Sequence, residues 1–314
     1  MNPTVKKTTI GGQALIEGIL MRGPDKMSIV CRTPRGIEIK DEPVFTKKKP
    51  DWQQWPVVRG VVTMIESMKM GIDALMYSAE IAEFEDDEKP NWLETKAPRG
   101  IRNWYTKNKK TVDQTASIAF SLVAALFLFF FIPTLLTSFF SRIIDSVILL
   151  NLVEGLIRIG IFLGYVILIS KMSEIDRVFG YHGAEHKSIH CYEHGDELTV
   201  ANVRKYPIEH PRCGTSFLFN VMLISIIVLS FFGWPNPLVR MLVRLLTLPV
   251  IAGIAYEINR AVGRSDSKLA ELVSKPGMWL QGTATVREPD DEQIEVAIIA
   301  LNQVIPEEPG KDLW

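Results

Sequence analysis

The stretch QTASIAFSLVAALFLFFFIPTLLTSFFS, residues 114–141, carries no charged side chain. A helix needs roughly 20 apolar residues to cross the hydrocarbon core of a bilayer, so this run is long enough for one span. Pro133 lies inside the run and is expected to kink the helix, which neighbouring helices in a bundle accommodate. The run predicts an α-helical membrane protein.

Three further apolar segments predict a bundle of about four transmembrane helices: 147–170, 217–232 and 238–258. Glu154 and Arg158 lie four residues apart on one helical face of the second segment, where the pair is expected to neutralise itself and face the bundle interior. Arg240 and Arg244 fit less well, because they fall at the outer end of the fourth segment. Either their side chains snorkel to the interface or the last two spans are shallower than a full crossing.

The distribution of basic residues orients these helices. Lysines and arginines are concentrated before the first span, after the second and after the fourth. The positive-inside rule then places both termini and the loop 172–216 in the cytoplasm of an integral membrane protein. The first 20 residues lack the apolar core of a signal peptide, and three cysteines are too few for a disulfide framework, which fits a reducing compartment.

The composition limits the partners of the chain. The formal net charge is −1, so bulk electrostatics indicate no nucleic-acid partner. Hydrophobic residues make up 47% of the chain although 23% of it is charged, because two mostly polar ends flank an apolar middle. The lipid bilayer is therefore the expected partner.

The polar ends predict a cytoplasmic α+β portion built from both termini. Residues 1–95 are expected to hold short strands, with a hairpin turn at Thr33–Gly36, and an amphipathic helix over 56–84 that either packs on a core or lies on the bilayer. In the C-terminal region 261–314, Asp290 is expected to cap a helix that packs on the amino-terminal part. Between the ends we expect a basic juxtamembrane linker, two transmembrane helices, a histidine- and cysteine-containing loop and two more transmembrane helices: 96–113, 114–171, 172–216 and 217–260.

All five histidines fall within the 29 residues from His182 to His210. The pattern H-x-x-E-H occurs there twice, first as His182-Gly-Ala-Glu185-His186. Residues four apart on a helix point in nearly the same direction, so His182 and His186 can hold one ion. This is the arrangement of inverted zinc proteases, in which the carboxylate activates water. The pattern predicts a divalent metal site, with zinc as the default ion and Glu185 as general base.

The third metal ligand has several candidates. His210 and Cys213 follow a short polar segment that could fold the chain back, and Glu257 lies at the predicted cytoplasmic end of the fourth span. A carboxylate at that depth is costly unless it is paired or ligates a metal. Glu257 has a competing interpretation, which is an ion pair with Arg260 on the same helix.

The second H-x-x-E-H copy starts at His190, about 12 Å further along the same helix. One ion cannot use both copies, so either one copy is accidental or there are two sites. The competing interpretation of the whole cluster is structural: histidines that cap helices, bond to loop backbone or meet lipid phosphates. Glu17 and Arg22, in the run QALIEGILMRGP, are expected to be surface residues, ion-paired residues or the lining of a site for an anionic substrate.

Seven motifs are distributed over nearly the whole chain: GGQALIEGILMRGP, YHGAEHKSIHCYE, ANVRKY, HPRCGTSF, YEINRAVGR, PGMWLQ and REPDD. Together they resemble the YqhQ-like family of bacterial membrane proteins, which has relatives in plastids and no assigned function. The resemblance implies several spans in a bacterial plasma membrane. It singles out ten positions: Glu17, Arg22, His182, Glu185, His186, Glu193, His210, Arg212, Cys213 and Glu257. His190 and His194 lie outside the family pattern, which favours a single site on the first H-x-x-E-H copy.

The sequence favours a metal-dependent membrane hydrolase that acts at the cytoplasmic face on a membrane peptide or a lipid-linked molecule. His182 and His186, with one or more of His210, Cys213 and Glu257, would hold the ion. Glu17, Arg22 and Arg212 are the candidate substrate-binding residues. The alternatives are a membrane scaffold or assembly factor with a structural metal site, in which four protein ligands close the coordination sphere, and a transporter component. Transport would require a homo-oligomer, because four spans with few charges give little to line a pathway.

Overall fold

A four-stranded antiparallel sheet is formed by the amino-terminal residues of the computed structural model, which describes residues 5–44, 49–82, 92–233, 236–265 and 267–313. The strands follow one another as a meander in the order β1-β2-β3-β4. They are β1 (Gly11–Leu15), β2 (Gly18–Arg22), β3 (Lys26–Thr33) and β4 (Gly36–Pro43). Thr33 lies opposite Gly36, so the predicted hairpin is confirmed.

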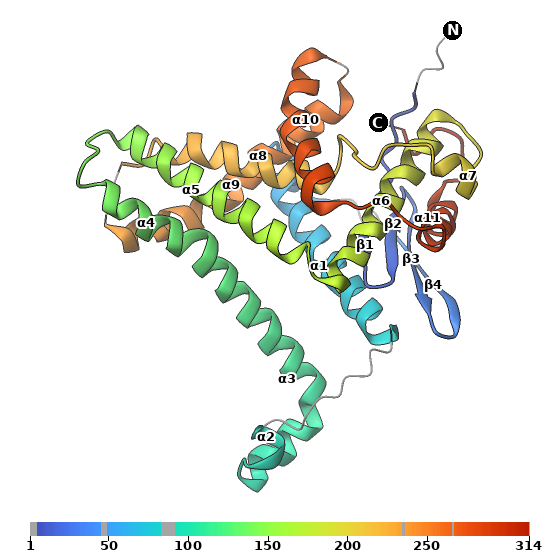
Figure 1. Ribbon diagram of the computed structural model, residues 1–314, viewed down its shortest axis with the longest axis horizontal. Coiled ribbons are helices and arrows are strands. Elements are labelled where there is room, and N and C mark those ends of the chain that lie inside the picture. The colour runs from blue at the N-terminus through green and yellow to red at the C-terminus, as the bar shows by residue number, and fades with distance from the viewer. Residues whose placement is uncertain (1–4, 45–48, 83–91, 234–235, 266, 314) are drawn as a thin grey trace.

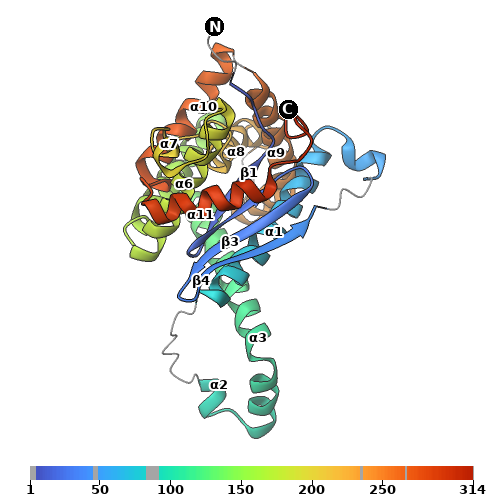
Figure 2. The ribbon, with the colours of Figure 1, turned by 90° about the vertical axis from the view of Figure 1, so that its right-hand side faces the viewer.

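One face of the sheet packs on two helices that come from distant parts of the chain, α6 (Ser173–His194) and α11 (Asp291–Val304). Figure 2 shows α11 lying across the sheet. Ile19, Met21 and Val30 enter this core, which also holds Tyr181 of α6. A sheet residue therefore contacts chain that lies more than 150 positions away.

The opposite face of the sheet packs on α1 (Val58–Ile81), the helix predicted over 56–84. Leu20, Ile29 and Cys31 meet Ala74 there. Because both faces are covered, β2 and β3 read as continuous apolar runs and not as an alternating pattern.

The other side of α1 bears on the choice between a packed helix and an interfacial one. Its buried residues are small and face the sheet and α9: Gly60, Gly71, Ala74 and Ser78. Ile65, Met68 and Ile72 form an exposed apolar stripe on the opposite side. One face of α1 therefore packs on a core, as the first interpretation predicts. The other face is apolar and exposed, as in a helix that lies on a bilayer. Residues 83–84, expected to end this helix, lie outside the described residues.

The C-terminal helix forms as predicted. Asp290 accepts from Gln293 N at 2.8 Å and Gln293 reciprocates, which completes a capping box. Ile294, Ala297 and Leu301 are fully buried against the sheet. An isolated bridge between Thr8 and Leu313 joins the two ends of the described chain. The α+β portion is therefore assembled from both ends of the chain.

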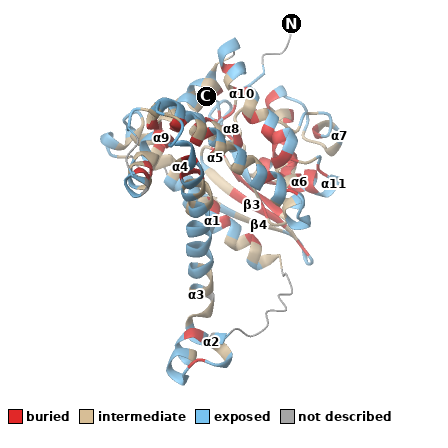
Figure 3. Ribbon diagram, turned by 60° about the vertical axis from the view of Figure 1, so that its left-hand side comes forward, coloured by how far each residue is buried: buried red, intermediate tan, exposed pale blue. Residues whose placement is uncertain are grey.

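Three helices are long and apolar enough to cross a membrane, over Thr111–Phe140, Val147–Ile169 and Leu238–Arg264, judged on the described residues. They lie on the left in Figure 1, away from the sheet, and much of their surface is exposed in Figure 3. The expectation of a fourth span over 217–232 is wrong. Helix α8 (Gly214–Leu229) has 16 residues, which is about 24 Å at 1.5 Å per residue and too short for a core of about 30 Å.

The first apolar helix includes most of the basic segment 96–113. Helix α3 (Arg99–Leu126) begins inside that segment and continues through a π-helical turn, η2 (Phe127–Phe131), into α4 (Ile132–Phe140). The π turn directly precedes Pro133, where the missing N–H interrupts regular helical bonding. The other two membrane-length helices are α5 (Val147–Ile169) and α9 (Pro237–Arg264). The remaining elements are short or connecting: η1 (Asp51–Gln54), α2 (Trp92–Thr95), α7 (Val200–Val203), α10 (Lys268–Leu280) and η3 (Gln281–Thr285).

The charged residues of the apolar helices meet inside the bundle. Arg158 Nη2 lies 3.2 Å from Glu154 Oε1, as the spacing predicts. Arg244 also binds the carboxylate of Glu154, and Arg240 Nη2 donates to Ser138 at 3.0 Å. Arg240 and Arg244 are each only 4% exposed, so the first of the two alternatives, side chains that snorkel outward, does not apply.

Candidate metal centre

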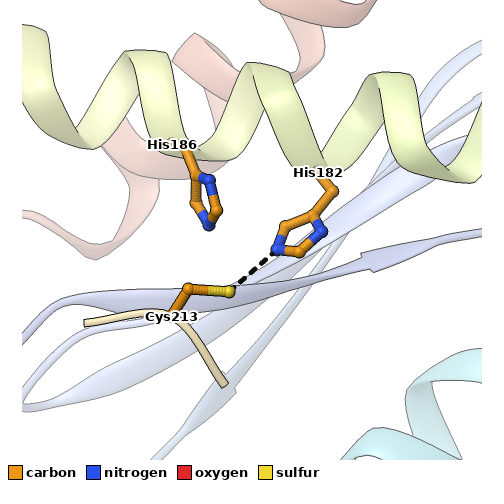
Figure 4. Close-up of side chains that lie close together, drawn as sticks. All are labelled: His182, His186 and Cys213. Atoms are coloured by element: carbon orange, nitrogen blue, oxygen red, sulfur yellow. Dashed lines mark hydrogen bonds between the residues drawn. The ribbon is translucent and has the colours of Figure 1, made fainter. Parts of the chain in front are cut away.

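His182, His186 and Cys213 bring their ligand atoms together within 4.8 Å of one another. The two histidines lie one turn apart on α6, and Cys213 directly precedes α8. His182 Nε2 is 3.2 Å from Cys213 Sγ, and Figure 4 shows both imidazoles directed toward the sulfur. The structure thus joins the first H-x-x-E-H copy to one of its three candidate partners.

Backbone carbonyls hold both imidazoles in a defined orientation. His182 Nδ1 lies 2.9 Å from Thr285 O, and His186 Nδ1 lies 2.6 Å from Ile208 O. With Nδ1 as the donor to a carbonyl, Nε2 is the nitrogen left to bind an ion. This is the outer-shell arrangement that metal-ligating histidines nearly always show.

Gly183 allows the chain that supplies the Thr285 carbonyl to approach α6. A Cβ at this position would lie 2.0 Å from Arg287 O and 3.3 Å from Pro289 Cδ. The same segment is fixed by Arg287 N, which donates to Phe179 O at 2.9 Å. The glycine of the H-x-x-E-H motif therefore has a packing role directly beside the ligands.

Glu185 lies on the same helix with one oxygen bonded and one without a partner. Its Oε1 accepts from Gly12 N at 2.9 Å, whereas Oε2 is buried and has no hydrogen-bond partner. Burial raises the pKa of Glu185, and the neighbouring His182 and His186 oppose that rise. Glu185 and the three candidate ligands line one cavity of about 410 Å³.

Cys213 and His182 shift each other's pKa. Burial would raise the pKa of Cys213, but His182 and His186 lower it well below its ordinary value. Burial would lower the pKa of His182, and the Cys213 thiolate outweighs this and raises the pKa to about 9. A thiolate is the form of cysteine that binds metals, so the surroundings of Cys213 favour ligation.

His210 belongs to a neighbouring group with His190 and Glu193, whose ligand atoms also lie within 4.8 Å of one another. Two other groups already occupy the Glu193 carboxylate: Arg212 donates to it, and Thr8 N donates to Oε1 at 2.8 Å. Burial lowers the pKa of His210 to about 3, so the imidazole is neutral at pH 7. The pKa of Glu193 falls to about 2, because the bonds from His210, Arg212 and Thr8 outweigh its burial. This group is a hydrogen-bonded network that ties the amino-terminal segment to α6.

The second H-x-x-E-H copy is divided between two environments. His190 and Glu193 enter the buried network, while His194 is exposed, lies 2.7 Å from the carbonyl of His190 through Nδ1 and places its ring beside Tyr206. The copy therefore has a structural use and does not repeat the first site.

Glu257 lies away from the ligand cluster, contrary to the expectation that it could be a metal ligand. Arg59 Nε donates to its Oε1 at 2.6 Å and Val57 N donates at 3.3 Å. The carboxylate joins α1 to α9, and its hydrogen-bonded partner is Arg59 and not the predicted Arg260. Proximity in the sequence favoured Arg260 as the partner, whereas the fold brings Arg59 to Glu257 from 198 positions away.

The three candidate substrate-binding residues separate in space. Glu17 forms an ion pair with Arg177, at 2.5 Å from Nε to Oε1, and accepts from Tyr181 OH at 3.3 Å. Arg22 lies at the end of β2 and is not among the described residues that line the cavity. Arg212 does line the cavity, next to Cys213. Of these three residues, only Arg212 is therefore placed to meet a molecule at the candidate metal centre.

Several residues that shape the site were not among the predicted site residues, although Gly12 and Gln281 lie in two of the seven motifs. Thr285 and Ile208 contribute backbone carbonyls, and Gly12 contributes an N–H. Gln281 clamps the chain beside His210, since its side chain bonds both the N–H and the C=O of that residue, at 2.8 and 3.0 Å. Backbone contacts of this kind depend on the fold and not on residue type.

Comparison with known sequences identifies the family. The family described as Protein of unknown function (DUF1385) matches residues 55–307. The chain belongs to this family. It is also 30% identical over 304 residues to the Uncharacterized protein YqhQ of Bacillus subtilis (strain 168), with 94% of this chain and 92% of that protein covered. The resemblance carried by the seven motifs is confirmed, and no solved structure matches the chain.

Proposed function

We propose that the chain is a metal-dependent integral membrane hydrolase that acts at the cytoplasmic face on a membrane peptide or a lipid-linked molecule. The observation that carries the proposal is the buried, unpartnered Oε2 of Glu185 beside His182, His186 and Cys213. A buried polar atom without a partner is costly, and a catalytic role is one of the explanations for keeping it. A general base next to a metal is such a function.

The donor set fits zinc. Imidazole nitrogen and thiolate sulfur are donors that zinc binds, and three protein ligands would leave the fourth position for water or substrate, as in catalytic zinc sites. The carbonyl bonds to both Nδ1 atoms supply the outer shell that such ligands need. A bound zinc ion would polarise the group under attack as a Lewis acid.

Glu185 is the residue placed to move protons. A carboxylate whose pKa is raised by burial accepts a proton from water more readily and can return it to the leaving group. Gly12 N holds Oε1, so Oε2 is the atom free to act. Arg212 lines the cavity and is the positively charged residue there that could bind an anionic substrate. It also forms an ion pair with Glu193.

The location of the site supports a membrane substrate. Helix α6 starts at Ser173, four positions after the apolar helix α5 ends at Ile169. The site therefore lies close to the end of a helix that is long and apolar enough to span a bilayer. The positive-inside rule assigns this end to the cytoplasm.

Metal analysis tests the proposal directly. Detergent-purified wild-type protein is expected to hold about one zinc ion per chain, and His182→Ala and Cys213→Ala are expected to lose it. His194→Ala is the matched control, because His194 lies on the same helix but is exposed. Glu185→Gln is expected to keep the metal. A folded wild-type protein that neither contains zinc nor accepts it on reloading would exclude the metal centre.

The number of protein ligands separates a hydrolase from a scaffold with a structural site. Cobalt(II) can replace zinc and reports its coordination through its visible spectrum. Added acetohydroxamate is expected to change that spectrum, because a site with three protein ligands has an open position. An unchanged spectrum would indicate four protein ligands and favour the scaffold.

A further inference from the structure

A second concentration of charge lies among the apolar helices, remote from the metal centre. Glu154 is 1% exposed, Arg158 is 9% exposed and Arg244 is 4% exposed. Both arginines bind the same carboxylate. They come from α5 and α9, at the left of the molecule in Figure 1, whereas α6 lies at the right.

The charges of this cluster do not balance. Two guanidinium groups and one carboxylate sum to +2 − 1 = +1, and Arg240 lies one helical turn before Arg244 on α9. Arginine stays protonated in proteins, so the cluster cannot lose its excess charge by releasing a proton. An uncompensated charge among apolar helices is costly and marks a functional site by default.

A cavity of about 290 Å³ opens beside the two arginines. Arg158, Arg244 and Ser225 are its polar lining residues, and Arg158 Nη1 lies 3.5 Å from Ser225 Oγ. The rest of the lining is apolar and includes Phe129, Phe162, Val221 and Leu248. The cavity is therefore amphipathic, with cationic groups on an otherwise apolar wall. Its volume is near the lower limit of about 300 Å³ for ligand pockets.

We infer that this cavity binds a phosphate-bearing lipid. Guanidinium groups recognise phosphate through paired N–H bonds, and a phosphodiester would supply the negative charge that the cluster lacks. An acyl chain would cover the apolar wall, which a free phosphate ion would leave exposed. The inference rests on the proposed membrane location but not on the metal site, because the two cavities share no lining residue among those described.

Lipid titration of delipidated protein in detergent, read by native mass spectrometry, tests the inference. Phosphatidylglycerol is expected to bind about tenfold more tightly than phosphatidylcholine, because only the first carries a net negative charge. Inorganic phosphate at the same concentrations is expected neither to bind nor to compete. Equal affinity for the two lipids would overturn the inference, and so would competition by free phosphate.

Matched variants locate the binding. Leu218 lines the cavity but is 49% exposed, so Leu218→Trp is expected to fill the opening without disturbing the core. Leu223→Trp is its control, at a 40% exposed position of α8 that does not line the cavity. Arg244→Gln is expected to reduce the preference for phosphatidylglycerol about tenfold, and Arg142→Gln, at an exposed arginine, is expected to leave it unchanged.

If Leu218→Trp binds phosphatidylglycerol as wild type does, the lipid is held elsewhere and the inference is wrong, whether or not Arg244→Gln folds. Zinc content serves as a separate readout in every variant. Loss of lipid binding with normal zinc would support the lipid site alone. Loss of both would indicate misfolding, and the exposed Leu218→Trp variant then decides the question.

Discussion

Gly183→Ala is expected to weaken the metal centre without removing any ligand. The new Cβ would lie 2.0 Å from Arg287 O, whereas ordinary contact starts at 3.4 Å, so the carbonyl must retreat by 3.4 − 2.0 = 1.4 Å. That movement strains the bond from Arg287 N to Phe179 O and shifts Thr285, two residues upstream, away from His182 Nδ1. Overpacking of this kind costs about 1–3 kcal/mol of stability. Loss of an outer-shell bond lowers metal affinity about 10- to 100-fold.

Competition of the protein with a zinc-binding dye, together with thermal unfolding, measures both effects. Gly160→Ala is the matched control, because a Cβ at Gly160 meets nothing within 4 Å. It is expected to bind zinc as the wild type does and to be equally or more stable, since alanine favours a helix over glycine. Wild-type zinc affinity and stability in Gly183→Ala would refute the role assigned to the Thr285 carbonyl.

Three further predictions follow from named contacts. Glu185→Gln is expected to raise the stability of the metal-free protein by about 1–3 kcal/mol in denaturant unfolding, because a buried unpartnered carboxylate is removed, and lower stability would contradict the geometry. In metal-free protein the free energy of unfolding is expected to decrease as the pH is lowered. The pKa of His210 is lowered from 6.5 to about 3 and that of Glu193 from 4.5 to about 2, so unfolding takes up protons below pH 6.5 and then below 4.5, with a slope of up to about 1.4 kcal/mol per pH unit for each group. His210→Gln is expected to remove the upper part of that slope, and an unchanged profile would exclude His210. Glu257→Gln is expected to cost about 1 kcal/mol, because it breaks a half-buried ion pair with Arg59, and to leave zinc content unchanged; loss of zinc would restore Glu257 as a ligand.

Local sequence signals predicted the elements whose determinants are local. The turn at Thr33–Gly36, the helix α1 and the cap at Asp290 all formed where expected. The number of membrane-length helices was wrong by one, because hydropathy continued past Leu229 to Phe232 while the helix did not. The inward direction of Arg244 was not predictable from the sequence, since it meets Glu154 on a helix 90 positions away.

The candidate site was predictable only in part. The spacing of His182, Glu185 and His186 placed one pair of ligands and a carboxylate on one helix turn. The sequence could not tell whether Cys213 or Glu257 lies beside His182 and His186, because that depends on which segment returns to α6. Glu17 and Arg177 show the same limit, since their ion pair spans 160 positions.

The joining of both chain ends in one α+β unit sets an order of events during synthesis. The sheet is complete at Pro43, but the helix that covers its Ile19 and Val30 face starts at Asp291, 291 − 43 = 248 residues later. At about 5–20 residues per second the ribosome needs roughly 12 to 50 s for that interval. During this time the hydrophobic face of the sheet stays uncovered while the apolar helices are being synthesised. Nascent chains should therefore depend on a chaperone until α11 emerges, and truncation before Asp291 should convert the protein into an aggregation-prone species.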